Sequence, residues 1–287
     1  EIDMPGHNQA LAAAYPEFFC FPDHNTKVST TGGVGLYLVC PHKPEIWKFY
    51  AAVFDELRDI FPSTMVHLGG DEAPLEKTWE KCPLSVKYRQ QKGMKDVHEE
   101  LKEFEAKMAS MLAARGKKPI FWYEKPWAQA SVYRKGDTVF TWRMGLTPST
   151  ITETKKQGLP LIIAAGEHCY LDYPQIPGQD NRGWMPTTTL EQSYKLNPAY
   201  GRPEQETDHI IGVQATMWAE QLPTLNHLPP RLRHCGSGLV TNERAFLGKL
   251  PAQAGRSAPI CPQAFQLRYG AHQGKRTPFQ IIRILYP

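Results

Sequence analysis

Apolar positions along the chain follow the spacing of helices in some segments and form short continuous runs in others. Residues 45–61 place apolar side chains at the three- and four-residue spacing of a helix, and Pro62 ends this pattern. A short apolar run at residues 65–68 follows and predicts a buried strand. Residues 96–115 repeat the helical stripe and end at Gly116, just before the next apolar run. The pattern therefore indicates helix and strand units that recur.

The remaining segments extend this alternation. The predicted strands occupy residues 65–68, 120–123, 138–142, 161–165 and 210–217, and a sixth ends near Met4. A third helix, with Pro148 in its first turn, is predicted over residues 147–158. Residues 8–44 are rich in Gly and Pro, and residues 168–208 are predicted as a long irregular loop. Strands that alternate with helices are typical of parallel βα units.

Polar and aromatic residues follow the ends of all six predicted strands. The active site of a (β/α)8 barrel lies at this end of its strands. A doubly wound sheet usually carries a Gly-rich phosphate loop instead, and none follows a predicted strand here. The pattern predicts an α/β fold of the (β/α)8 TIM barrel class. Six strands are two short of eight, so we expect that the first two βα units are missing from this chain or that the barrel is incomplete.

Composition and charge exclude several classes of partner. The content of 41% hydrophobic and 22% charged residues is ordinary for a globular protein. The formal charge of +4 is uneven, because residues 221–287 hold nine Lys or Arg and one acid, Glu243. This basic tail lacks the interleaved aromatics and dense clusters of a nucleic-acid surface, so we predict no nucleic-acid partner. The apolar runs are too short to span a membrane.

The cysteines give no recognisable motif. No two of the six form a C-x-x-C pair, which argues against a zinc knuckle or redox motif and leaves disulfides open. We therefore predict no metal site and no cofactor. The six are Cys20, Cys40, Cys82, Cys169, Cys235 and Cys261.

The strongest candidate for chemistry is the M-V-H-L-G-G-D-E stretch at residues 65–72. Side chains alternate along a strand, so Asp71 and Glu72 can enter one pocket only if the backbone leaves strand geometry, which two glycines allow. Adjacent acids in a partly dry pocket suit general acid and base work, because their environments can separate their pKa values. A solvated acidic turn before Pro74 is the alternative that this pattern leaves open.

Several segments together resemble glycoside hydrolase family 20, the beta-N-acetylhexosaminidases. They are E-I-D-M-P-G-H at residues 1–7, H-L-G-G-D-E at 67–72, Y-L-D-Y at 170–173, G-V-Q-A-T-M-W-A-E at 212–220 and the tryptophans between them. The resemblance covers residues 1–228, which would supply strands 3 to 8 of the family barrel. Residues 229–287 would form a divergent basic C-terminal tail.

The resemblance implies a retaining, substrate-assisted hydrolysis of terminal non-reducing N-acetylhexosamine residues, GlcNAc or GalNAc, from beta-glycosides. In this mechanism the acetamido oxygen of the substrate attacks the anomeric carbon, and water opens the resulting oxazolinium. Glu72 matches the general acid/base, and Asp71 matches the residue that stabilises the acetamido nitrogen. Tyr170 matches the hydroxyl that holds the acetamido oxygen, and His7 matches a histidine that supports the acid/base.

The resemblance also implies a sugar site rich in aromatic residues. Trp122, Trp142 and Trp218 match the walls of this site, Trp184 matches a further aromatic residue, and Asp172 and Glu220 match acceptors for the 4- and 6-hydroxyls. The expected partners are oligosaccharides or glycoconjugates that contain N-acetylhexosamine. A periplasmic, secreted or lysosomal location is expected for such a protein.

Two other functions remain open. The family carries an arginine after its first strand and an aspartate after its second, and neither segment is in this chain. A carbohydrate-binding remnant that has lost turnover is therefore the alternative to an active enzyme. A metal-dependent barrel hydrolase that uses His7, His67, Asp71 and Glu72 is the third hypothesis, although a Trp-rich pocket suits a sugar better than an open metal site.

Overall fold

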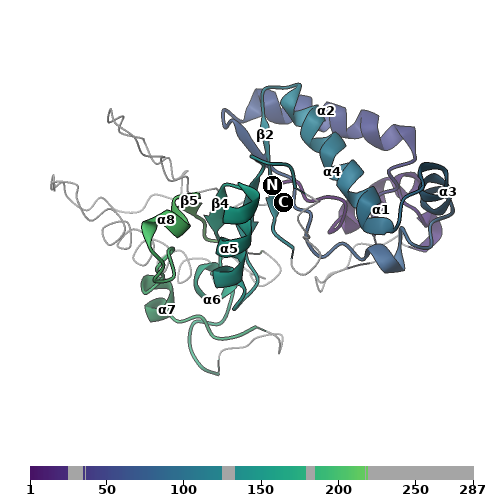
Figure 1. Ribbon diagram of the computed structural model, residues 1–287. Coiled ribbons are helices and arrows are strands. Elements are labelled where there is room, and N and C mark those ends of the chain that lie inside the picture. The colour runs from purple at the N-terminus through teal and green to yellow at the C-terminus, as the bar shows by residue number, and fades with distance from the viewer. Residues whose placement is uncertain (25–34, 36, 125–132, 179–184, 217, 219–287) are drawn as a thin grey trace. The chain divides into compact units, whose positions relative to one another are not determined.

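The computed structural model describes residues 1–24, 35, 37–124, 133–178, 185–216 and 218 (Figure 1). The chain divides into two units, Glu1–Phe140 with Lys156–Pro160 and Thr141–Lys155 with Leu161–Pro287, and each is described by itself. Two predicted site residues, Trp184 and Glu220, lie outside the described residues, as does the predicted domain boundary at residue 228.

The strands of unit 1 are parallel. Strand β1 (Met65–His67) pairs with β2 (Lys118–Trp122), and β2 pairs with β3 (Thr138–Thr141). The predicted strand that ends near Met4 is not a regular strand. Its residues nevertheless lie beside the β1 segment, because Ile2 N donates to His67 O at 2.9 Å and Met4 N donates to Leu68 O at 3.0 Å. The predicted strand is therefore an extended segment that is hydrogen-bonded to the β1 segment without forming a regular strand.

Two long helices confirm the predictions from periodicity. Helix α2 (Pro44–Ile60) buries Ile46, Tyr50 and Phe54 at four-residue spacing. Helix α4 (Val97–Ala113) starts at the N-cap residue Asp96, whose carboxylate accepts the backbone N–H groups of residues 98 and 99. Helix α4 packs against both β2 and α2, and Figure 1 shows the two helices running side by side. These contacts place the apolar stripes of both helices in the core of unit 1.

The sequence did not predict helix α3 (Pro83–Lys92). Its two buried positions are Ser85 and Arg89, so it carries no apolar stripe that a periodicity search could find. The segment predicted to be rich in loops also contains short helical pieces. These are α1 (Gln9–Ala14), η1 (Pro16–Phe18) and η2 (Pro22–His24).

Unit 2 holds the parallel pair β4 (Leu161–Ile163) and β5 (Ile210–Val213) and the predicted helix α5 (Thr147–Gln157). Strand β5 is shorter than predicted, although Thr216 continues its direction through a parallel bridge to Tyr170. The predicted irregular loop also contains short helices, which have too few residues for a periodic signal. They are α6 (Gly166–Cys169), α7 (Leu190–Tyr194) and α8 (Glu204–Thr207). No helix in the described part of the chain is long and apolar enough to cross a membrane.

Candidate active site

The backbone leaves strand geometry directly after β1. Gly69 and Gly70 have φ angles of 70° and 94°, and Glu72 has a φ of 50°. A Cβ atom at Gly69 would overlap the carboxylate of Asp3, so this position requires glycine for space as well as for conformation. The turn directs the side chains of Asp71 and Glu72 toward the same histidine. Because of this turn, the side chains of two adjacent acids no longer point to opposite faces, as they would on a strand.

His7 contacts both acids. Its Nε2 lies 3.4 Å from Asp71 Oδ2 and 3.5 Å from Glu72 Oε2. Burial disfavours the imidazolium, but the hydrogen bonds to Asp71 and Glu72 outweigh it and raise the pKa of His7 to about 11. His7 is therefore a cation at neutral pH, and it lies between the side chains of Asp71 and Glu72. Asp71 is buried, so the alternative of a solvated acidic turn is wrong for this residue.

Asp3 supports the same loop from residues 1–7. Its Oδ1 accepts the backbone N–H of Gly70 at 3.2 Å. Burial, and then the neighbouring charge of Asp71, hold the pKa of Asp3 well above its usual range. The raised pKa makes Asp3 hold its proton more readily, which lowers the repulsion between Asp3 and the nearby acid Asp71.

A metal ion could be held near the acids by Asp3, His7 and Asp71, whose ligand atoms all lie within 4.8 Å of one another. This set differs from the one proposed for a metal-dependent hydrolase, because it does not include His67. Metal ligation requires a neutral histidine, whereas the raised pKa of His7 favours its charged form. The raised pKa of His7 therefore favours an ion pair with the acids over metal ligation at neutral pH.

Trp122 and His67 lie beside the acid loop and are buried. Trp122 Nε1 donates to Glu1 Oε1 at 2.7 Å, and the Trp122 ring centroid lies 4.7 Å from that of His67. Burial and then Asp71 raise the pKa of Glu1 to about 7. His67 Nδ1 accepts the backbone N–H of Gly69 at 3.0 Å, and burial lowers the pKa of this imidazole, which keeps it neutral. These contacts give Trp122 and His67 a supporting position beneath the loop.

The predicted residues of unit 2 gather around Tyr170. Its ring centroid lies 6.5 Å from that of Trp142, at an interplanar angle of 18°, and 6.3 Å from that of Trp218. The bridge between Tyr170 and Thr216 places the aromatic ring of residue 170 beside the segment that carries Trp218. Tyr173 and Met185 belong to the same cluster, and Asp172 is only 1% exposed. Three of the predicted aromatic residues therefore form one apolar group.

The comparisons with known proteins agree with the motifs. The model of glycosyl hydrolase family 20, catalytic domain, matches residues 1–232. The chain belongs to this family. The chain is similar to the solved structure of a beta-N-acetylhexosaminidase, with a TM-score of 0.77 and 51% identity. The match covers 89% of this chain and 58% of the chain in that structure. The predicted fold class, the α/β TIM barrel of these neighbours, is confirmed.

Curated relatives of this family 20 chain are longer than it is. A beta-hexosaminidase from Akkermansia muciniphila is 60% identical over 228 residues, which are 79% of this chain and 45% of the relative. A beta-hexosaminidase from Porphyromonas gingivalis is 33% identical over 229 residues, 78% of this chain and 28% of the relative. The chain thus spans less than half the length of either relative.

Two acids of this family 20 chain, one partly buried and one buried, were not predicted from the sequence. One is Glu1, which accepts from Trp122 Nε1. The other is Glu105 on α4, whose Oε1 lies beneath Gly70, 3.2 Å from where a Cβ would be. Burial holds the pKa of Glu105 well above its usual range. A signal was present, because Glu105 interrupts the apolar stripe formed by Leu101 and Met108, where an acid is out of place.

Proposed function

We propose that the chain supplies the catalytic acids of a beta-N-acetylhexosaminidase, which releases terminal GlcNAc or GalNAc from beta-glycosides by a retaining, substrate-assisted mechanism. The observation that carries the proposal is the convergence of Asp71 and Glu72 on His7. The two acidic side chains lie together just after the end of strand β1, and the chain is 60% identical to a beta-hexosaminidase. Both facts fit general acid–base hydrolysis of a glycoside.

The two acids have different surroundings, which fit different roles. Glu72 is partly exposed and can reach a substrate oxygen, so it would protonate the leaving oxygen while the acetamido oxygen attacks the anomeric carbon. Glu72, now ionised, would then take a proton from water as that water adds to the same carbon and opens the oxazolinium. Asp71 is buried and fixed by His7, so it would act as a stationary anion beside the nitrogen that becomes positive.

The aromatic cluster of unit 2 would serve substrate binding. Trp142 and Trp218 offer apolar faces of the kind that pack on a pyranose ring, and the Tyr170 hydroxyl would donate to the acetamido oxygen. Asp172 would accept from a sugar hydroxyl. Trp184 as a further aromatic residue of the sugar site and Glu220 as an acceptor for a sugar hydroxyl remain predictions from the resemblance.

A chimera tests the proposed function. The matching 228 residues of the Akkermansia relative are replaced by those of this chain, so that the remaining part of a known beta-hexosaminidase is present. We expect the chimera to hydrolyse nitrophenyl beta-GlcNAc and beta-GalNAc but not the beta-glucoside, which lacks the acetamido nucleophile. Nuclear magnetic resonance should show the beta anomer as the first product, because the mechanism retains configuration.

Three results would contradict this mechanism. Equal turnover of the glucoside would show that the acetamido group takes no part. An alpha anomer as the first product would show direct attack by water, as in a metal-dependent hydrolase. Binding of N-acetylhexosamine without any turnover would favour the carbohydrate-binding remnant.

Replacing Trp218 by Ala should weaken binding of N-acetylhexosamine about fivefold, since a lost aromatic stack costs on the order of 1 kcal/mol. The side chain is only partly buried, so the melting temperature should change little. Calorimetric affinity and thermal unfolding are measured on the same variant. Trp47→Ala, which removes a partly buried tryptophan from α2, is the matched control and should keep its affinity. A collapse of stability with unchanged affinity would identify Trp218 as a core residue.

A further inference from the structure

Three cysteines from separate segments of unit 1 converge. The sulfur atoms of Cys20, Cys40 and Cys82 all lie within 4.8 Å of one another, and Cys40 Sγ lies 3.9 Å from Cys82 Sγ. Cys40 and Cys82 are buried, with 0% and 1% exposure. The sequence concealed this cluster, because its members are not close enough along the chain to form a metal-binding motif.

Hydrogen bonds to the backbone hold the three cysteine-bearing segments together. Phe19 and Val39 form an antiparallel bridge, and Cys40 N donates to Phe18 O at 2.8 Å. Trp79 Nε1 donates to Val39 O at 2.8 Å, which ties the chain just before Cys82 to the chain just before Cys40. The cysteines are thus placed by hydrogen bonds that do not involve their own sulfur atoms. The site is preorganised by the fold.

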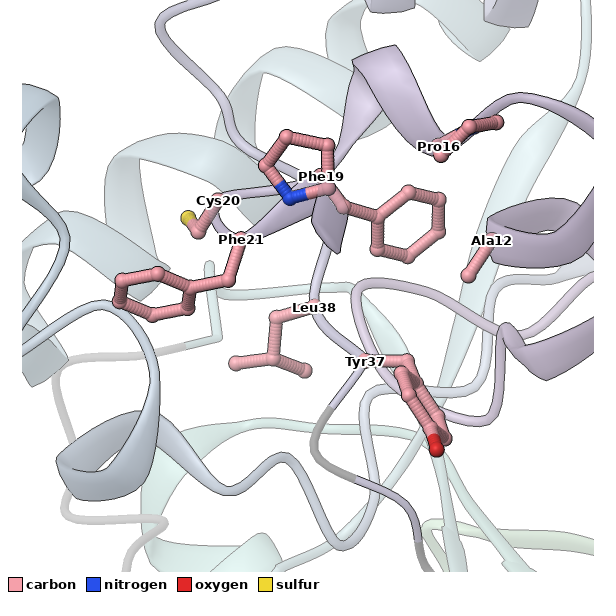
Figure 2. A pocket seen from close by; sticks show the side chains of 8 residues that line it. Ala12, Pro16, Phe19, Cys20, Phe21, Tyr37 and Leu38 are labelled. Carbon is pink, nitrogen blue, oxygen red and sulfur yellow. The ribbon is translucent and has the colours of Figure 1, made fainter. Parts of the chain in front are cut away.

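A pocket lies beside this cluster, and Cys20 is one of the residues that line it. Figure 2 shows the pocket between α1, η1 and the segment with Tyr37 and Leu38, and the Cys20 sulfur points away from the rings of Phe19 and Tyr37. The Cys20 sulfur lies within 4.8 Å of the sulfur atoms of Cys40 and Cys82.

The sulfur separation fits a shared metal ion better than a disulfide. A disulfide requires an S–S distance of about 2.05 Å. Two thiolates on a tetrahedral zinc ion, with Zn–S bonds of about 2.3 Å, are about 3.8 Å apart. The distance between Cys40 and Cys82 is 3.9 Å. None of the four described cysteines is in a disulfide.

The surroundings of Cys82 offer a fourth ligand. Cys82 is the N-cap residue of α3. Ser85 follows at the third position of the helix, from which a side chain can reach back toward the N-cap residue. The Ser85 hydroxyl is fully buried and makes no hydrogen bond of normal geometry within the described residues. A buried hydroxyl in this state needs a partner.

We propose that Cys20, Cys40 and Cys82 bind one structural Zn²⁺ ion as thiolates, with the Ser85 hydroxyl as the fourth ligand. Soft thiolate ligands select zinc over the hard cations magnesium and calcium, and a closed four-ligand set is typical of a structural site. This proposal does not depend on the enzymatic function.

The ion would stabilise the segments that flank the acid loop. Cys82 is the N-cap residue of α3, the first α-helix after Asp71 and Glu72 in the chain. Leu38, two residues before Cys40, packs at Gly6, where a Cβ would lie 3.8 Å from Leu38 Cδ2 and 3.4 Å from the Asp71 carbonyl oxygen. Zinc binding would therefore stabilise the folded state of the region that lies against the backbone of Asp71.

Metal content of the full 287-residue chain tests the site. After reduction, loading with zinc and gel filtration, we expect about one Zn²⁺ per chain, because four protein ligands complete a tetrahedral site. Loading with cobalt should give the intense thiolate charge-transfer absorption of tetrahedral Co²⁺. Cys40→Ser should abolish both signals. Cys169→Ser, the matched control in α6, should keep them.

A gain of affinity keeps the test informative if Cys40→Ser does not fold. Ser85→Cys supplies a fourth thiolate and should tighten zinc binding on the order of tenfold or more in competition with a chelator. The proposal is overturned if the wild-type chain holds no zinc after loading, if Cys169→Ser loses as much metal as Cys40→Ser, or if Ser85→Cys leaves the affinity unchanged. Peptide mass analysis that finds two of the three cysteines in a disulfide in the unreduced protein would overturn it as well.

Discussion

Glu72→Gln should slow the hydrolysis of natural N-acetylhexosaminides by about 10² to 10⁴, because general acid–base assistance is worth this much. An alkoxide leaving group needs a proton, and an amide cannot donate one in its place. Nitrophenolate leaves without protonation, so the first step on nitrophenyl substrates should be affected much less. The measurement is kcat/KM for leaving groups that differ in pKa, in the chimera with and without the substitution.

The control for this variant is an acid that is close in the chain but exposed. Glu76→Gln, in helix η3 (Leu75–Lys77), should change neither the rate nor its dependence on the leaving group. A Glu72→Gln variant that loses the same factor on every leaving group would contradict the assignment of Glu72 as general acid.

Asp71→Asn should reduce hydrolysis of every N-acetylhexosaminide by about 10² to 10³, the usual cost of removing one preorganised electrostatic group. The oxazolinium nitrogen loses its counter-charge whichever group leaves, so the factor should be the same for alkyl and nitrophenyl glycosides. A thiazoline analogue of the intermediate should also bind more weakly, since it resembles the charged species. Inhibition constants and kcat/KM are measured together.

Asp71→Asn has a second expected consequence, which concerns His7. Asp71 and Glu72 are the hydrogen-bonding acids that raise the pKa of His7 to about 11. With one acid neutral, this pKa should fall, and nuclear magnetic resonance titration of the imidazole measures the change. If instead both acid variants lose the same activity across all leaving groups, the separate roles are wrong, and a shared-proton or metal-bound carboxylate pair explains the site better.

Periodicity predicted the helices that bury apolar stripes and missed the one that does not. Helices α2 and α4 have apolar residues on one face, so their ends were predicted within two residues. Helix α3 buries Ser85 and Arg89 instead, and the Arg89 guanidinium lies 2.7 Å from the carboxylate of Glu100. A helix whose buried face is polar depends on partners elsewhere in the chain. No local pattern reports those partners.

The sequence by itself determined the family, the barrel class and the acid loop, because these depend on local order: two glycines, then two acids, after an apolar strand. Only the tertiary structure decided which groups surround them. His7 meets Asp71 across 64 positions of the chain, Glu105 lies beneath Gly70, and Cys20 meets Cys40 and Cys82. Charge, burial and metal affinity depend on distances in space. These distances are set by packing between segments that are far apart in the chain, and no periodic pattern in the sequence reports which segments will pack together.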